Sequence, residues 1–251
     1  MTIENIQLEG QVCVITGNSE VSNALYGKHL AKYGARIAVL SDTKSSLDVS
    51  VQVIKKHGEC IGIQSDARDE NSVVDAFTHV EQHFGKIDIL VNNNQLEFAK
   101  PFLDNSVDEW DSLLSNNVRA TFLSCREAGK RMVSQKYGRI VNIISGLAER
   151  GLANSVAYCA SQASIVSLTR ALALEWARSN IRVNAIGTGW LSNEEKSVEE
   201  QQKELLVRYI PLRRKGNYHD IASLLVFLAS EHCGYTTGQP IYVDGGLMAH
   251  S

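Results

Sequence analysis

The chain has 251 residues, and its 25 Lys and Arg against 28 Asp and Glu give a formal net charge of −3. This weak acidity excludes a dedicated nucleic-acid-binding protein, because no basic stripe exists to neutralise phosphates. The five cysteines are scattered and form no metal-binding pattern, so we expect neither a disulfide framework nor a metal. The sequence contains no signal-peptide pattern and no run of about 18 apolar residues. We therefore expect a cytoplasmic protein without membrane contact.

Seven short apolar segments alternate with longer segments of helical periodicity. Each apolar segment is continuous, as in strands that are buried on both faces of a parallel sheet. The segments are residues 11–16, 35–40, 60–65, 88–93, 139–144, 181–186 and 240–245. This alternation predicts an α/β fold, a Rossmann-like doubly wound parallel sheet of seven strands with helices on both faces.

The segment from about 188 to 210 interrupts the alternation. It is rich in charged residues and follows a predicted strand at the edge of the sheet where open α/β sheets bind ligands. We expect a lid-like insertion here, with a solvated helical excursion as an equal alternative. Because no linker or change of composition divides the chain, residues 1–251 are expected to form one domain.

Polar motifs lie at the ends of several predicted strands. They are TGNSEVSN (16–23), NNNQ (92–95), Ser145 thirteen residues before Tyr158, Asn117 in the helix before the fifth strand, and VDGG (243–246). This layout resembles the short-chain dehydrogenase/reductase family over essentially the whole chain. The resemblance implies NAD(P)-dependent relatives that assemble as dimers of dimers, through the tyrosine-bearing helix and the last strand.

The motif after the first strand departs from that family. Its members hold the cofactor pyrophosphate with a TGxxxGxG turn at a helix N-terminus. In this chain Gly17 is kept, but Val21 and Asn23 occupy the two later glycine positions. We expect the β-branched side chain of Val21 to project into the space of the phosphate oxygens. The alternative is a shifted turn that still binds the cofactor.

Other cofactor positions implied by the resemblance are partly kept. Asn92 is retained after the fourth strand, but Asn94 and Gln95 replace the small residues of the family's NNAG motif. Asp42 lies one residue after the position whose carboxylate holds the adenosine ribose in NAD-using members, and it would repel the 2′-phosphate of NADP. Asp66 matches the acidic position near the adenine.

Three of the four catalytic residues implied by the resemblance are present in this chain. Ser145 matches the donor to the substrate oxygen, Tyr158 the proton-transfer group, and Asn117 the asparagine of the proton relay. The lysine that lowers the tyrosine pKa is replaced by Gln162, which is neutral. Loss of positioned acid–base help costs about 10²–10⁴ in rate. We therefore expect these residues to be vestigial.

These departures together predict a non-catalytic subunit that binds no cofactor itself. It would support a motif-complete short-chain dehydrogenase subunit in an α2β2 heterotetramer, through helix 155–177 and the C-terminal strand region. NAD is expected in that partner, which would oxidise a hydroxyacyl or hydroxyacyl-CoA substrate. Within the family, the chain looks like the inactive subunit of the alcohol dehydrogenase that acts on a hydroxybenzyl-succinyl-CoA intermediate in anaerobic toluene breakdown.

Three alternatives remain from the sequence. The first is an active NAD-dependent oxidoreductase whose Ser–Tyr site works without the lysine. The second is a cofactor-free lyase similar to halohydrin dehalogenases, which need an arginine where this chain has Gln162. The third is a binding module for an acyl-CoA or a nucleotide fragment, with phosphates at Arg213, Arg214 and Lys215.

Overall fold

The structure is a computed structural model that describes residues 6–193 and 196–249. Its seven strands form one sheet in the order β3-β2-β1-β4-β5-β6-β7, and every neighbouring pair is parallel. The strands are β1 (Val12–Thr16), β2 (Arg36–Ser41), β3 (Cys60–Gln64), β4 (Ile89–Asn92), β5 (Gly138–Ser145), β6 (Ile181–Thr188) and β7 (Pro240–Val243). The predicted seven-stranded, doubly wound α/β fold is confirmed.

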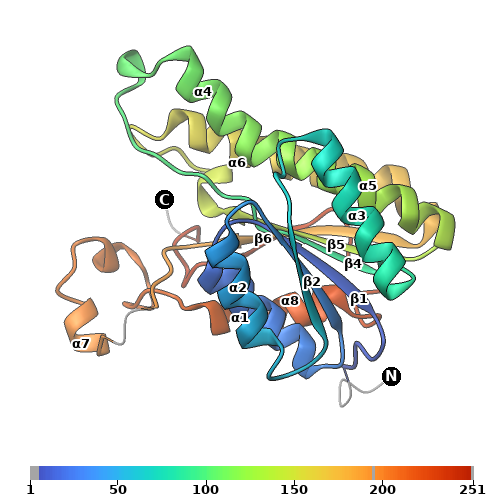
Figure 1. Ribbon diagram of the computed structural model, residues 1–251. Coiled ribbons are helices and arrows are strands. Elements are labelled where there is room, and N and C mark those ends of the chain that lie inside the picture. Colours follow the sequence, from blue (N-terminus) through green and yellow to red (C-terminus); the bar gives the residue numbers. More distant parts are fainter. Residues whose placement is uncertain (1–5, 194–195, 250–251) are drawn as a thin grey trace.

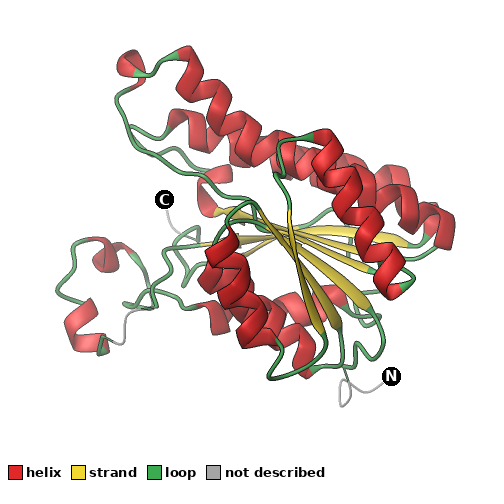
Figure 2. Ribbon diagram, viewed as in Figure 1, coloured by secondary structure: helices red, strands yellow, loops and turns green. Residues whose placement is uncertain are grey.

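Helices cover both faces of the sheet (Figures 1 and 2). One face carries α1 (Glu20–Lys32), α2 (Lys44–Ile54) and α8 (Tyr218–Ala229). The other carries α3 (Glu70–Phe84), α5 (Ala120–Gln135) and α6 (Val156–Trp176), while α4 (Val107–Leu114) runs into α5 and packs along α6. None of the helices in the described ranges has the length and apolarity needed to cross a membrane.

The two faces of β1 explain its continuous apolar sequence. Cys13 and Ile15 pack in the core beneath α1 and α8, whereas Val12 and Val14 pack in the core beneath α3 and α5. Successive side chains of a strand point to opposite faces, so a strand covered on both sides needs apolar residues at every position. The continuous apolar sequence of β1 is therefore a direct consequence of the helical layers on both faces of the sheet.

The strand order reverses direction at β1, which has β2 on one side and β4 on the other. Open α/β sheets bind ligands in the crevice beyond the carboxyl ends of such strands. Here the turn after β1 approaches the chain after β4 closely. Gly17 has φ +135°, and a Cβ at this position would collide with the backbone oxygen of Asn93. The first glycine of the turn is thus required by the fold itself.

The predicted insertion lies between β6 and α8. Its described part contains the short helix α7 (Val198–Gln201) and a 3₁₀ turn at Leu206–Tyr209, and residues 194–195 of the segment lie outside the described residues. Ser197 and Glu200 cap α7 reciprocally. α7 projects away from the sheet (Figure 1).

Candidate active site

A cavity of about 840 Å³ opens at the carboxyl ends of the central strands. Ser145 at the end of β5 and Tyr158 in the first turn of α6 both line it, and Thr188 contributes from the end of β6. Ser19 and Ser22 line it from the start of α1. The fold therefore brings two of the predicted catalytic residues into one cavity beside the β1 turn.

Tyr158 is almost fully buried, with 3% of its surface exposed. Burial raises the pKa of its phenol above the usual 10, and the negative charge of Glu97 raises it further. A hydrogen bond with the Ser145 side chain acts in the opposite direction but does not cancel these effects. At neutral pH Tyr158 is therefore a protonated phenol that can donate a proton.

Gln162 is fully buried four residues after Tyr158. Its Oε1 accepts a hydrogen bond of 2.9 Å from the backbone N–H of Ser145, and its Nε2 lies 3.4 Å from Ser161 Oγ. The side chain thus holds the end of β5 in place. An amide carries no charge, so Gln162 cannot lower the pKa of Tyr158 as a lysine would.

Asn117 lies in a π-helical turn, Ser115–Arg119, between α4 and α5. Its Oδ1 accepts from the backbone N–H of Leu96 at 2.7 Å, and its Nδ2 donates to the Leu96 carbonyl at 2.9 Å. The same Nδ2 donates to Ser161 Oγ at 3.0 Å. Both ends of this amide are therefore used to fix the chain after β4 and to tie it to α6.

The asparagines after β4 tie the turn after β1 to the sheet. Asn23, at a glycine position of the family motif, is fully buried and donates to the Gly17 carbonyl at 2.7 Å. Asn93 donates to both Asn23 Oδ1 and Ser22 Oγ, at 2.8 and 2.7 Å. The Asn23 side chain therefore lies inside the turn, and hydrogen bonds satisfy both ends of its buried amide.

Three further predicted positions take part in the same network or lie beside it. Asn92 donates to Asn142 Oδ1 at 2.8 Å, and Asn94 donates to Thr16 Oγ1 at 2.9 Å. Gln95 is exposed on the cavity wall and donates to the Ile143 carbonyl at 3.1 Å. The replaced NNAG motif thus braces the ends of β1, β4 and β5.

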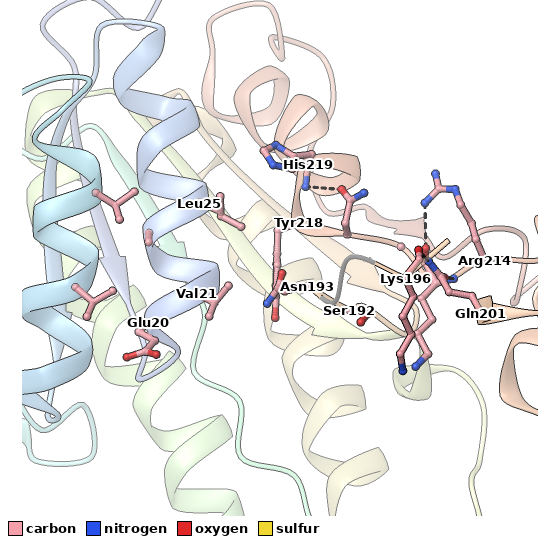
Figure 3. A pocket seen from close by; sticks show the side chains of 16 residues that line it. Glu20, Val21, Leu25, Ser192, Asn193, Lys196, Gln201, Arg214, Tyr218 and His219 are labelled. Atoms are coloured by element: carbon pink, nitrogen blue, oxygen red, sulfur yellow. Dashed lines mark hydrogen bonds between the residues drawn. The ribbon is translucent and has the colours of Figure 1, made fainter. Parts of the chain in front are cut away.

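Val21 lies in a second pocket of about 660 Å³, on the outer side of α1. Figure 3 shows Val21 and Leu25 extending from α1 toward Tyr218, with Arg214 across the pocket. Val21 does not line the cavity of Ser145 and Tyr158. The side chain that we expected to fill the phosphate space thus belongs to another pocket.

The cations around this outer pocket are paired. Arg214 forms two hydrogen bonds with Asp220, at 2.8 and 2.9 Å, and Lys215 forms an ion pair with Glu204. These contacts compete with any role of the basic turn in phosphate binding.

The start of α1 fits a dinucleotide pyrophosphate. Ser19 caps the helix by accepting from the N–H of Ser22 at 3.3 Å. The N–H groups of Glu20 and Val21 have no hydrogen-bond partner within residues 6–193 and 196–249. Such N–H groups bind phosphate at helix N-termini, and the adjoining Ser19 and Ser22 face the cavity.

The adenosine end keeps its acidic groups. Asp42 follows β2, and its backbone N–H donates to Asn18 Oδ1 at 3.2 Å. Arg68 forms hydrogen bonds of 2.8 and 2.9 Å with Asp66, which lower the pKa of that carboxyl, and it lies 3.9 Å from the Asp42 carboxylate. A partly exposed carboxylate at the end of β2 suits ribose hydroxyls and disfavours a 2′-phosphate.

Two charged residues of the cavity escaped the sequence analysis. Glu97 and Arg150 both line it, and they lie in the loops after β4 and β5. Both loops leave the carboxyl ends of central strands, which is the signal by which they could have been found. Within residues 6–193 and 196–249, no group of three or more His, Cys, Asp or Glu is placed to hold a metal.

The parallel sheet and the crossover at β1 define a Rossmann-like doubly wound α/β protein, a class that binds ligands beyond the carboxyl ends of its strands. Residues 25–248 match the family described as enoyl-(acyl carrier protein) reductase. The 3-oxoacyl-(acyl-carrier-protein) reductase of Aquifex aeolicus is 31% identical over 246 residues, covering 97% of this chain and 99% of that protein. The chain belongs to the short-chain dehydrogenase/reductase family.

Solved structures agree with this assignment. A putative short-chain alcohol dehydrogenase from Sinorhizobium meliloti has a TM-score of 0.91 and 33% identity, covering 98% of this chain and 100% of that one. A xylitol dehydrogenase with NAD⁺ bound has a TM-score of 0.88 and 28% identity, covering 95% of this chain and 99% of that one.

These comparisons correct the expectation that the chain binds no cofactor. Its relatives are reductases and dehydrogenases, and the xylitol dehydrogenase holds NAD⁺ on the same fold. The physical reason lies in the β1 turn, because the Val21 side chain lies in the outer pocket rather than in the cavity. The relatives also favour the active oxidoreductase over the non-catalytic subunit.

Proposed function

We propose that this chain is an NAD-dependent oxidoreductase that interconverts an alcohol and a carbonyl compound at Ser145 and Tyr158, without a lysine. The observation that carries the proposal is that both side chains line one cavity of about 840 Å³, beside the first turn of α1. The relatives, which are reductases and dehydrogenases, support it.

The residues that would hold the cofactor lie along the crossover at β1. The free N–H groups of Glu20 and Val21 would bind the pyrophosphate. Asp42 would bind the adenosine ribose and select NAD over NADP by repulsion of the 2′-phosphate. When bound, the nicotinamide supplies or accepts the hydride.

The side chains of this chain handle the substrate oxygen and its proton. The Ser145 hydroxyl donates a hydrogen bond to the carbonyl oxygen, and the Tyr158 phenol delivers a proton to the same oxygen during reduction. Because its raised pKa keeps Tyr158 protonated, reduction is favoured at neutral pH. Oxidation of an alcohol needs the phenolate, and therefore speeds up with rising pH.

Two measurements test the proposal. Calorimetric titration of the purified chain should show that NADH binds, and binds more tightly than NADPH. Reduction of a panel of ketones with NADH should then be lost in Tyr158→Phe, while the affinity for NADH is retained. Absence of NADH binding, or equal turnover by wild type and Tyr158→Phe, would refute it.

A second candidate concerns catalysis alone and leaves cofactor binding as proposed above. In it, Ser145 and Tyr158 are vestigial, and the chain supports a motif-complete subunit in an α2β2 assembly that oxidises a hydroxyacyl-CoA, as in the hydroxybenzyl-succinyl-CoA dehydrogenase. Gln162 favours this candidate, because its amide is committed to Ser145. Co-expression with such a relative tests it: the activity of the complex should survive Tyr158→Phe in this chain.

Apolar side chains on the surface of α5 and α6 suit an assembly through helix 155–177. Leu174 is 83% exposed, and Phe122 and Val156 are each nearly half exposed. Size-exclusion chromatography of the chain alone and together with the relative shows whether the two chains form a common α2β2 complex.

We further propose that the insertion at about 188–210 acts as a lid of a single domain. Leu206 and Tyr209 of this segment line the cavity that holds Tyr158. Deleting 198–205 should raise the KM for substrate and leave the affinity for NADH unchanged.

The five cysteines are unpaired, which suits the reducing cytoplasm as the site of action.

A further inference from the structure

Arg150 is an exposed cation of the cavity wall, and it lacks a partner of opposite sign within the described residues, as Glu97 on the same wall does. It lies five residues after Ser145, beyond the short 3₁₀ turn Gly146–Ala148 that follows β5. Its guanidinium forms no ion pair and no hydrogen bond with any part of the chain that the structure describes. The neighbouring acid does not neutralise it, because Glu149 lies 3.5 Å from Arg170 of α6.

Arg150 differs in this respect from the cations of the outer pocket. Arg214 is held by two hydrogen bonds to Asp220, and Lys215 is paired with Glu204. A guanidinium presents five donors in a planar fork that matches a carboxylate. An unpaired guanidinium in a cavity wall is therefore suited to a carboxylate of the ligand.

The second charge of the cavity determines where that carboxylate can lie. Glu97 also lines the cavity, and its negative charge raises the pKa of both Tyr158 and Tyr218. An anionic group next to Tyr158 would meet the same negative potential. The carboxylate of a ligand is thus kept away from the reacting carbon and directed to Arg150.

The rest of the wall describes the body of the ligand. Phe98, Leu147, Leu152, Trp190 and Leu206 contribute apolar side chains to the cavity. Apolar walls with a few placed polar groups bind apolar compounds and orient them through those groups. An aryl or alkyl body would contact this apolar part of the wall, while the serines, Asn93, Gln95 and Thr188 make up much of the rest.

We propose that Arg150 binds the carboxylate of the substrate, and that the substrates are oxo or hydroxy acids with an apolar body and a carboxylate separated from the reacting carbon. The inference rests on the proposed oxidoreductase function. Arg150 is a specificity-determining residue in this proposal, and the proton and hydride chemistry does not involve it.

A matched pair of ketones tests the proposal. 4-Oxo-4-phenylbutanoate carries the carboxylate, and its methyl ester has the same body without the charge. With NADH, wild type should reduce the acid about 10- to 100-fold more efficiently, in kcat/KM, than the ester, as expected for a charge-assisted pair. In Arg150→Met this preference should disappear through a higher KM for the acid, and Arg150→Lys should restore part of it.

A matched control removes a different arginine. Arg178 is exposed at the end of α6 and does not line the cavity, so Arg178→Met should keep the wild-type preference. An equal preference for acid and ester in wild type, or an unchanged preference in Arg150→Met, overturns the proposal while leaving the oxidoreductase function intact.

Binding separates this proposal from the function on which it rests. Calorimetric titration of the chain with the acid and with the ester, in the presence of NADH, needs no turnover. Tighter binding of the acid that is lost in Arg150→Met supports the role of Arg150 even if neither ketone is reduced, and the oxidoreductase function is then decided separately by NADH binding and by Tyr158→Phe. Equal binding of the acid by wild type and Arg150→Met overturns the role of Arg150.

Discussion

The side-chain oxygen of Gln162 accepts a hydrogen bond of 2.9 Å from the backbone N–H of Ser145. The residue that replaces the family's lysine is thus used to hold the end of β5, directly beside the Tyr158 site. This contact preserves the position of Ser145 but supplies no positive charge to the phenol. The positions of Ser145 and Tyr158 are therefore kept, but no lysine lowers the pKa of the Tyr158 phenol.

Gln162→Lys should restore that charge. An ammonium near Tyr158 lowers the pKa of the phenol, so we expect alcohol oxidation at pH 8 to accelerate about 10- to 100-fold. The lost hydrogen bond to Ser145 costs about 1 kcal/mol, and burial of the ammonium adds to this cost, so the Tm should fall by more than about 3 °C. Rates are followed by NADH absorbance, and Tm by calorimetry.

Gln162→Met is the matched control for this change. It removes the same hydrogen bond but buries no charge, so we expect a smaller loss of Tm, of about 3 °C, and no gain in rate. A gain of equal size in both variants would show that the charge is not the cause.

Glu97→Gln should shift the pH dependence of alcohol oxidation. The active phenolate exists above the pKa of Tyr158, which lies above its usual value of 10, so the wild-type rate should rise with pH through pH 9. Removing the Glu97 charge lowers that pKa, and the profile should move to lower pH. The reduction rate, which needs the phenol, should remain flat between pH 6 and 8. An unmoved profile in Glu97→Gln would contradict the assignment of Tyr158 as the titrating group.

Asp42→Ala should weaken the discrimination between the two cofactors. The carboxylate would repel the 2′-phosphate of NADPH, and Arg68 lies 3.9 Å from it. Without Asp42 this repulsion is lost while Arg68 stays bound to Asp66 nearby, so we expect the NADH to NADPH preference to fall roughly 10-fold. Asp48→Asn, which removes an exposed carboxylate from α2, should leave the preference unchanged. Affinities from calorimetric titration decide between these outcomes.

Arg139→Met should destabilise the fold. Arg139 is 3% exposed, and burial lowers the pKa of its guanidinium. It donates to the carbonyls of Gly138, Asn180 and Ser230, at 2.8, 3.2 and 3.1 Å. Methionine fills a similar volume but leaves these carbonyls without the donor, at a cost of about 3 kcal/mol and about 10 °C in Tm.

The exposed Arg178 offers the comparison for this prediction. Arg178→Met should change the Tm by less than about 2 °C, because surface substitutions cost little. If the two variants melt at the same temperature, the buried guanidinium is not a structural requirement.

The fold could be predicted because its evidence is local. Cys13 and Ile15 face one core while Val12 and Val14 face the other, so an uninterrupted apolar run is enough to identify a strand covered on both sides. The positions of Ser145 and Tyr158 follow from the same pattern, since one ends a strand and the other begins the next helix.

The cofactor site could be predicted in part. The motif positions could be assigned from the sequence, but the direction of the Val21 side chain was not part of the motif. That direction depends on how α1 packs against α2, Tyr218 and the insertion, which are distant in the sequence. Asn23 is a similar case, since its amide is accommodated only because Asn93 and the Gly17 carbonyl lie within hydrogen-bond distance.

By itself, the sequence determined the family, the parallel sheet and the absence of the lysine, because periodicity and residue identity at a motif position are properties of the chain. Only the tertiary structure decided what the replacing side chains do. It directs Gln162 to the Ser145 backbone and Val21 to the outer pocket, and it brings Glu97 and Arg150 to the cavity of Tyr158. The reason is that these contacts join loops from different strands, and their side chains meet only after the sheet has formed.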